Sequence, residues 1–209
     1  MYTVLFLSTG IFIGVVIWQL VVWLGEIRDK DKKYEVAAAF AQKVGKPLLV
    51  AGGPFGTYRV RRLLNMPAHG NGDVCLDVVC CAFTGHPRGV IADVTQIPFS
   101  DKAFGAVFAS HLLEHLPIID DAKRALAELN RVAEAVFIAY PSRQSIGAWL
   151  KREHHLWIWQ EGDVTYIEQR GNSGDKNMEE YRGQICQKST FITENVLRGR
   201  SVKKEVRDD

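Results

Sequence analysis

The sequence predicts an α/β domain, built on a doubly wound and mostly parallel sheet, that is preceded by one transmembrane helix. Three observations support this: an uncharged apolar run at the N-terminus, an alternation of apolar strands with helices, and glycine or aspartate where strands end. The predicted units are an anchor helix at 1–25, a charged juxtamembrane linker at 26–34, the α/β domain at 35–170 and a polar C-terminal extension at 171–209.

The N-terminal run carries no charged residue before Glu26 and is long enough to cross a hydrocarbon core of about 30 Å. We therefore predict membrane contact through residues 2–24, with Trp18 and Trp23 at the interface. A cleaved signal peptide is the alternative, but the run lacks a basic start and an A-x-A-like cleavage site. The anchor is the favoured interpretation.

Charge next to the apolar run predicts the orientation of the span. Basic residues follow it and none precedes it: Arg28, Lys30, Lys32 and Lys33. The positive-inside bias then places the following domain on the cytoplasmic side of a single-pass protein. Gly10 and Gly14 form a G-x-x-x-G spacing that would admit a partner transmembrane helix, although glycines also occur at this spacing by chance.

The remaining elements follow in order along the chain. A helix at 34–46 precedes a strand at 48–51, a glycine turn, a helix at 57–66 and an apolar run at 74–83. Strands at 89–93, 103–110 and 135–140 and a helix at 111–134 complete the β and α alternation. Beyond it we expect an antiparallel hairpin at the sheet edge, turning at 161–163, and then a polar tail without chemistry.

Composition narrows the function. The 209 residues are 47% hydrophobic and 24% charged, which is enough for a core, and a net charge of +2 gives no reason to expect nucleic acid. The cysteines lack the paired spacing of a zinc site, so we expect reduced thiols in the cytosol: Cys75, Cys80, Cys81 and Cys186.

The candidate site lies beyond the carboxyl ends of the strands, where open α/β sheets bind their ligands. The first strand is followed by Gly52, Gly53 and Gly56, the second ends at Asp77, and the third ends at Asp93. Glycines let a backbone approach a ligand, and the two acids could accept hydrogen bonds from ribose hydroxyls and an adenine amino group. The plainer alternative is a sharp turn with two turn-forming aspartates.

The run ADVTQIPFSDKAFGAVFASHLLEHL, followed by ALAELNRVAEAVFIAYPS, resembles the middle of a class I S-adenosylmethionine-dependent methyltransferase of the broad ubiquinone-biosynthesis type. The resemblance covers about 46–142 and is most specific at 93–104. It implies a Rossmann-like, seven-stranded methyltransferase fold and S-adenosylmethionine as cofactor. The implied donor contacts are Gly52 and Gly56 in the turn, Asp77 for the ribose, and Asp93 with Val94 for the adenine.

The sequence departs from the family pattern at several points. Val50 replaces the usual acid before the glycine turn, Pro54 replaces a central glycine, and Gly105 replaces an acid in the fourth strand. The glycine-rich turn after Arg131 is also missing, and the stretch between Asp77 and Gly89 is short for a helix. Two functions remain open: a membrane-anchored methyltransferase acting on a membrane-associated acceptor, and a catalytically inactive subunit that docks in a membrane protein complex.

The sequence contains two histidine patterns outside the strand-end site. His111, Glu114 and His115 spell H-x-x-E-H, which on a helix could bind zinc. The sequence shows no distal third ligand, so we predict no metal site. We expect His115 to line a pocket or to have a structural role, and His111 could face the acceptor site. The pair His154 and His155 near two tryptophans could line a lipid-facing entrance, but packing is the favoured interpretation.

Overall fold

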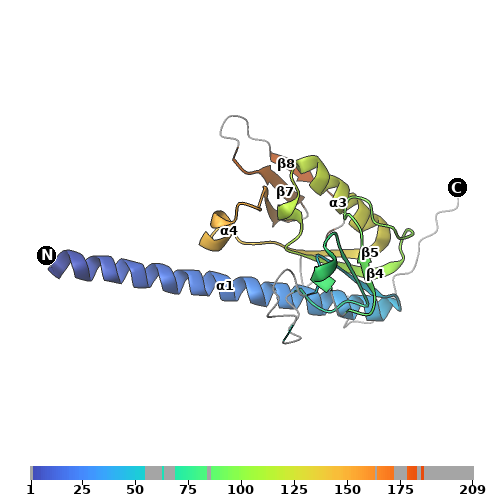
Figure 1. Cartoon of the computed structure of the whole chain (residues 1–209), viewed down its shortest axis with the longest axis horizontal. Coiled ribbons are helices and arrows are strands. Elements are labelled where there is room, and N and C mark those ends of the chain that lie inside the picture. The colour runs from blue at the N-terminus through green and yellow to red at the C-terminus, as the bar shows by residue number, and fades with distance from the viewer. Residues whose placement is uncertain are drawn as a thin grey trace.

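The structure, a computed structural model, describes residues 2–54, 63, 69–83, 86–162, 164–171, 178–182 and 185. Its centre is a parallel five-stranded sheet in the order β3-β2-β1-β4-β5 (Figure 1). The strands are β1 Leu48–Ala51, β2 Val74–Asp77, β3 Gly89–Ile91, β4 Phe104–Ser110 and β5 Ala133–Ala139. The order reverses between β1 and β4, as in a Rossmann-like fold.

The N-terminal helix differs from the predicted anchor, linker and short helix, because α1 runs without a break over Tyr2–Val44. At 1.5 Å per residue it is about 65 Å long. No proline or glycine interrupts it between Gly25 and Gly45, and Lys33 pairs with Asp29 one turn earlier at 2.8 Å. The charged stretch at 26–34 is therefore helical and continuous with the apolar run.

The C-terminal part of α1 covers one face of the sheet. Its small residues Ala37 and Ala41 are buried against Ala106 and Phe108 of β4. A Cβ built on Gly105 would lie 2.8 Å from the Ala41 Cα, so glycine is needed there for the helix to approach the strand this closely. The glycine that replaces the family's usual acid thus has a packing role.

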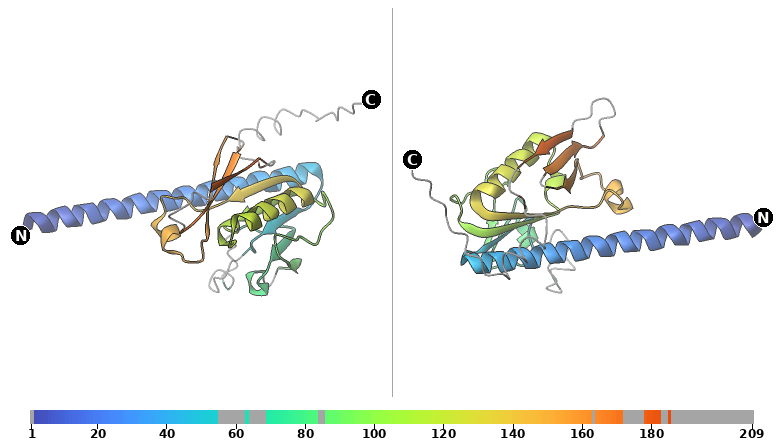
Figure 2. Two further views of the ribbon diagram at one scale, coloured as in Figure 1. Left: turned by 90° about the horizontal axis from the view of Figure 1, so that it is seen from above. Right: turned by 180° about the vertical axis from the view of Figure 1, so that it is seen from behind.

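The opposite face is covered by α3, which spans Ile119–Val132 (Figure 2). The predicted helix at 111–134 begins later than expected, because Leu113–His115 form the short 3₁₀ helix η2 and the chain turns at Pro117 before α3. Leu126 and Leu129 of α3 are fully buried and join Val107 and Val136 in the larger of two core clusters. Helices therefore lie on both faces, which confirms the doubly wound layering.

After β5 the chain leaves the sheet instead of extending it to seven strands. The helix α4 (Ile146–Leu150) leads into β6 (Leu156–Glu161), which pairs with β7 (Val164–Gln169) and then with β8 (Met178–Tyr181) in a separate antiparallel sheet, in the order β6-β7-β8. The hairpin at 161–163 is confirmed, but its placement at the edge of the main sheet is wrong. Leu156, Ile158 and Ile167 instead join the core cluster on the α3 side.

Several predictions lie outside the described residues or end differently. Outside them lie Gly56, Cys186, the residues beyond 185 and all of the predicted helix at 57–66 except Leu63. The predicted polar extension at 171–209 is not tail throughout, because β8 at Met178–Tyr181 pairs with β7 in the second sheet. The apolar run at 74–83 is split, since β2 ends at Asp77 and the 3₁₀ helix η1 covers Cys80–Phe83. The interval between Asp77 and Gly89 therefore holds a short turn of helix, consistent with its length.

Candidate functional site

The predicted site residues gather at the carboxyl edge of the sheet, as the strand order requires. The N–H of Gly52, just after β1, donates to the carbonyl of Leu76 at 2.9 Å, and the N–H of Ala92 donates to the carbonyl of Asp77 at 3.1 Å. These bonds continue the ladders past the strand ends. Gly52, Asp77 and Asp93 therefore lie along one edge formed by β1, β2 and β3.

The glycine turn has the backbone conformation that glycine favours, with φ of +105° at Gly52 and +65° at Gly53. However, its close neighbours are protein atoms. A Cβ on Gly53 would lie 2.6 Å from the Ala82 Cβ of η1, and one on Gly52 would lie 3.0 Å from the Ser110 carbonyl oxygen. Both glycines are thus explained by packing of the chain on itself, and Pro54 is buried beside them.

The two aspartates both act as turn-forming acceptors. Asp77 Oδ1 accepts from the Val79 N–H at 2.9 Å, whereas Asp93 Oδ1 accepts from the Thr95 N–H at 2.8 Å and from its hydroxyl at 2.7 Å. Burial raises the pKa of the Asp77 carboxyl, opposed by backbone donors and the charge of His115. Asp93 is exposed, and Val94 beside it is buried in the core.

These residues fit S-adenosylmethionine in part. Carboxylates at neighbouring strand ends are suitable acceptors for hydroxyl and amino groups of a nucleoside. The glycine turn does not fit in the arrangement described, since Ala82 occupies the space beside Gly53 that a ligand would need. A cavity of 330 Å³ exists, but Tyr34, Lys46 and Asp73 line it at the amino edge, so we assign the site to the carboxyl edge on topology.

The most specific motif of the sequence, Ile97-Pro98-Phe99, has a clear structural role. Arg131 of α3 donates to the carbonyls of Ile97 at 2.9 Å and Phe99 at 2.7 Å. Glu128 accepts from the Ile97 N–H at 2.8 Å, and its hydrogen bonds with Arg131 lower the pKa of its carboxyl. The motif therefore fixes the loop before β4 to α3.

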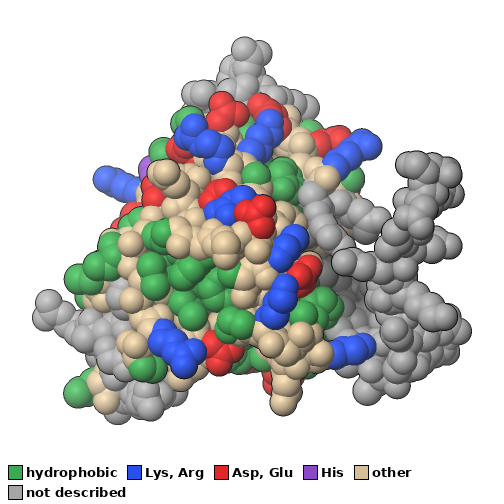
Figure 3. Space-filling view, turned by 90° about the vertical axis from the view of Figure 1, so that its right-hand side faces the viewer, with side chains coloured by type: hydrophobic (Ala, Val, Ile, Leu, Met, Phe, Trp, Pro, Cys, Tyr) green, Lys and Arg blue, Asp and Glu red, His purple; other side chains and the backbone are tan. Residues whose placement is uncertain are grey.

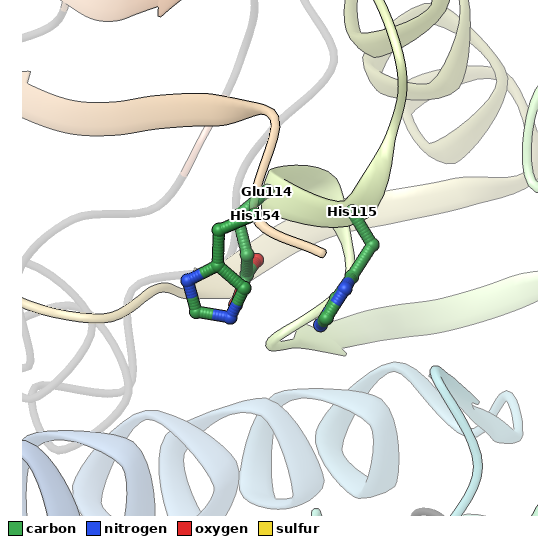
Figure 4. A group of neighbouring side chains, drawn as sticks. All are labelled: Glu114, His115 and His154. Carbon is green, nitrogen blue, oxygen red and sulfur yellow. The ribbon is translucent and has the colours of Figure 1, made fainter. Parts of the chain in front are cut away.

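A second group of polar residues lies at the end of β4 and was only partly foreseen. Glu114, His115 and His154 offer ligand atoms that all lie within 4.8 Å of one another (Figure 4). His154 comes from the loop before β6 and is buried, and burial lowers its pKa to about 4. The sequence did not predict the contact between these side chains, because His154 lies 39 positions after His115. The histidine pair at 154–155 was the one feature of the sequence that pointed to it.

His111 belongs to the same region. Its backbone has φ of +50°, and its Nδ1 lies 3.2 Å from Glu114 Oε1. Its ring also contacts that of His69, which lies hydrogen bonded to the Ser110 hydroxyl at 2.9 Å. The predicted packing role of the tryptophans is consistent with Trp157, which is buried and lies 4.9 Å from the Trp149 ring.

Comparison with known proteins finds a family model that matches part of the chain. Residues 69–135 match a family model described as a methyltransferase domain. No curated protein matches the chain.

Three solved structures are among those to which the chain is similar. An S-adenosylmethionine-dependent methyltransferase from Clostridium acetobutylicum is 13% identical, with 81% of this chain and 80% of that chain covered and a TM-score of 0.40. The PH0226 protein from Pyrococcus horikoshii is 14% identical, with 73% and 74% covered and a TM-score of 0.36. An S-adenosylmethionine-bound amino pentose methyltransferase from Micromonospora echinaspora is 14% identical, with 82% and 83% covered and a TM-score of 0.37. Similarity at this level carries no information on activity.

Proposed function

We propose, on the premise that residues 69–135 make this chain a member of the class I S-adenosylmethionine-dependent methyltransferase family, that it is a membrane-anchored methyltransferase acting on a membrane-associated acceptor. The cofactor of this family is S-adenosylmethionine, which supplies an activated methyl group. Asp77 and Asp93 are the residues that would hold its nucleoside. Methyl transfer depends mainly on in-line positioning of donor and acceptor, so no acid or base residue is required.

The observation that carries the proposal is the direction of α1 relative to the sheet. Near its C-terminal end α1 packs at Gly105, where β4 begins. Towards its N-terminus it meets the chain beyond the end of β5, because the Ser142 N–H donates to Glu26 at 2.7 Å. The apolar part therefore projects beyond the carboxyl edge, and a span at residues 2–24 would turn the candidate site towards the bilayer (Figure 1).

The contacts of Gln19 define how far the domain reaches along the helix. Its side chain donates to the Gln144 carbonyl at 3.0 Å and accepts from the Ile146 N–H at 2.8 Å. Residues 2–18 would then be the part of α1 that crosses the hydrocarbon, about 26 Å of helix at 1.5 Å per residue, which is near the required length. We therefore place the boundary of the span near Gln19 instead of residue 24.

Several features support this orientation. The exposed side chains of Trp149 and Leu150 lie in α4, whose first residue Ile146 contacts Gln19, and Lys151 follows them, as expected for an interfacial helix. None of the strongly apolar window of α1 is buried in the protein, unlike a core helix. The face at the far end of the molecule carries basic and acidic side chains around a hydrophobic area (Figure 3). The basic residues at 28–33 give the proposed cytoplasmic side.

The test is calorimetric titration of S-adenosylmethionine into the full chain in detergent micelles. Saturable binding that is lost in Asp93→Ala but retained in Asp31→Ala, an exposed acid on α1, would support the donor site. If the full chain is folded by circular dichroism and takes up no donor, the methyltransferase proposal fails. Once binding is found, transfer of radioactive methyl groups to membrane extract tests the acceptor.

A second function, that of an inactive subunit in a membrane complex, is favoured by the packing of Ala82 against Gly53. Partner helices could approach Gly10 and Gly14, because a Cβ at either glycine would meet no atom within 4 Å. This proposal predicts a partner retained in mild detergent and lost in Gly10→Ile/Gly14→Ile. A chain that purifies alone from its native membrane would contradict it.

A further inference from the structure

We propose that Glu114, His115 and His154 form a site for a divalent transition metal of the zinc type, which holds the start of β6 against η2. The three side chains come from two segments that only the fold brings together, and their ligand atoms lie within 4.8 Å of one another (Figure 4). None of these three residues is a proposed donor contact, although the charge of His115 reaches Asp77, and the proposal does not depend on the proposed function.

Burial without hydrogen bonds is the first argument for a ligand. The side chains of Glu114 and His154 are 1% and 4% exposed. Within the described part of the chain, Glu114 Oε2 and both ring nitrogens of His154 have no hydrogen-bond partner. Buried polar atoms are nearly always paired, and three orphaned atoms at one place call for an explanation. A cation bound by Oε2 and one imidazole nitrogen would satisfy two of them.

The second argument is the support around the three ligands. His115 Nδ1 lies 3.2 Å from the Glu153 carbonyl oxygen, which requires that nitrogen to be the donor and leaves Nε2 as the lone-pair ligand. Metal-binding histidines typically carry such a bond on their second nitrogen. His111 lies against Glu114 Oε1, the oxygen not orphaned, and the His155 N–H donates to the Glu114 carbonyl at 2.7 Å.

The donor set indicates the class of metal. Two imidazoles with one carboxylate suit zinc and its first-row neighbours better than calcium or magnesium, which prefer oxygen ligands alone. Three protein ligands leave a fourth position of a tetrahedral site for water. That position would be accessible from the exposed side of the site, because His115 is exposed whereas the other two ligands are buried.

The site would strengthen the contact between two parts of the fold that already meet through hydrogen bonds, such as those from His155 N–H to the Glu114 carbonyl and from Gln169 to the Pro117 carbonyl. Glu114 and His115 lie in η2, at the end of β4, and His154 immediately precedes β6. The rings of His115 and His154 already meet edge to face with centroids 4.9 Å apart. Metal binding would therefore fix the second sheet to the carboxyl edge of the first.

The experiment uses the full chain in detergent, purified without a polyhistidine tag, stripped with chelator and titrated with Zn²⁺ and with Co²⁺. We expect one tight site, a rise in melting temperature on binding, and a tetrahedral Co²⁺ spectrum without a thiolate charge-transfer band, which excludes the cysteines. His115→Ala, at an exposed position, should lower Zn²⁺ affinity at least 100-fold and abolish the melting-temperature shift. His155→Ala is the matched control and should keep both.

Two outcomes would overturn the proposal. A folded, stripped chain that binds neither ion would show that these residues are not a metal site. Tight binding that survives unchanged in His115→Ala, or that gives a thiolate spectrum, would place the metal elsewhere. Because His115 is exposed, loss of binding can be separated from loss of folding by circular dichroism of the same variant.

Discussion

At the scale of single residues, the positions that looked unusual in the sequence prove to be positions of close packing. Gly105 stands where an acid is usual in the family that the sequence resembles, yet it is the point where α1 touches β4. Gly53 lies in the predicted ligand-binding turn, yet Ala82 lies against it. Both examples follow from the same fact: a glycine in a sequence marks a close approach or a special turn without naming what approaches.

Gly105→Ala should destabilise the protein by about 1–3 kcal/mol, because the added methyl group would overlap the Ala41 backbone, which cannot move without shifting α1. Gly147→Ala is the control, since the nearest atom to its new Cβ is the Ser145 hydroxyl at 3.7 Å. Urea unfolding of both variants in detergent gives the comparison. Equal midpoints would contradict the close helix-to-strand contact.

Cys75 predicts how stability changes at alkaline pH. Burial raises the pKa of its thiol from 9.0 to about 11, so the folded protein holds this proton more tightly than the unfolded chain. The contribution is fully present below pH 9 and is lost as the pH rises towards 11, amounting to about 2 kcal/mol. Unfolding measured from pH 8 to 11 should therefore be less pH-dependent in Cys75→Ala, whereas an unchanged slope would refute the assignment.

At the scale of elements, the Ile97-Pro98-Phe99 motif forms the contacts between α3 and the loop before β4. The guanidinium of Arg131 serves two carbonyls of that loop and two carboxylates, those of Glu128 and Asp101. A planar fork of donors is needed for this geometry, and a lysine ammonium does not provide it.

Arg131→Lys should therefore lower the melting temperature and speed amide exchange in the loop at 97–103, although the charge is kept. Arg124→Lys in the same helix is the control, because that side chain is largely exposed and bonds only to Asp121 among the described residues. If thermal unfolding and hydrogen exchange respond equally to the two substitutions, the motif is not held by Arg131.

At the scale of the whole molecule, α1 links the candidate site to the proposed membrane. This helix packs on the sheet and also continues beyond its carboxyl edge. Its contacts at Gln19 and Glu26 fix the direction of the domain relative to the apolar run. A tether with a flexible linker would leave that direction undefined.

The membrane orientation predicts which surface touches lipid. In reconstituted vesicles, a photoactivatable phospholipid should cross-link to α4, near Trp149 and Leu150, and leave the turn at 100–103 unlabelled. Deleting residues 2–25 should release the chain from carbonate-washed membranes. Cross-links confined to the turn at 100–103, at the amino edge, would contradict the orientation, and carbonate release of the full chain would contradict the span.

The sequence by itself determined the α/β alternation, the five parallel strands, the apolar N-terminal helix and the line of Gly52, Asp77 and Asp93 along one edge. These features depend on local periodicity and on the rule that parallel strands end at a common edge. Only the tertiary structure decided that α1 is continuous, that the hairpin packs on the α3 side as a second sheet, and that His154 meets Glu114 and His115. Such contacts depend on how separated segments pack, because burial of Leu156, Ile158 and Ile167 in the core determines where the loop carrying His154 must lie.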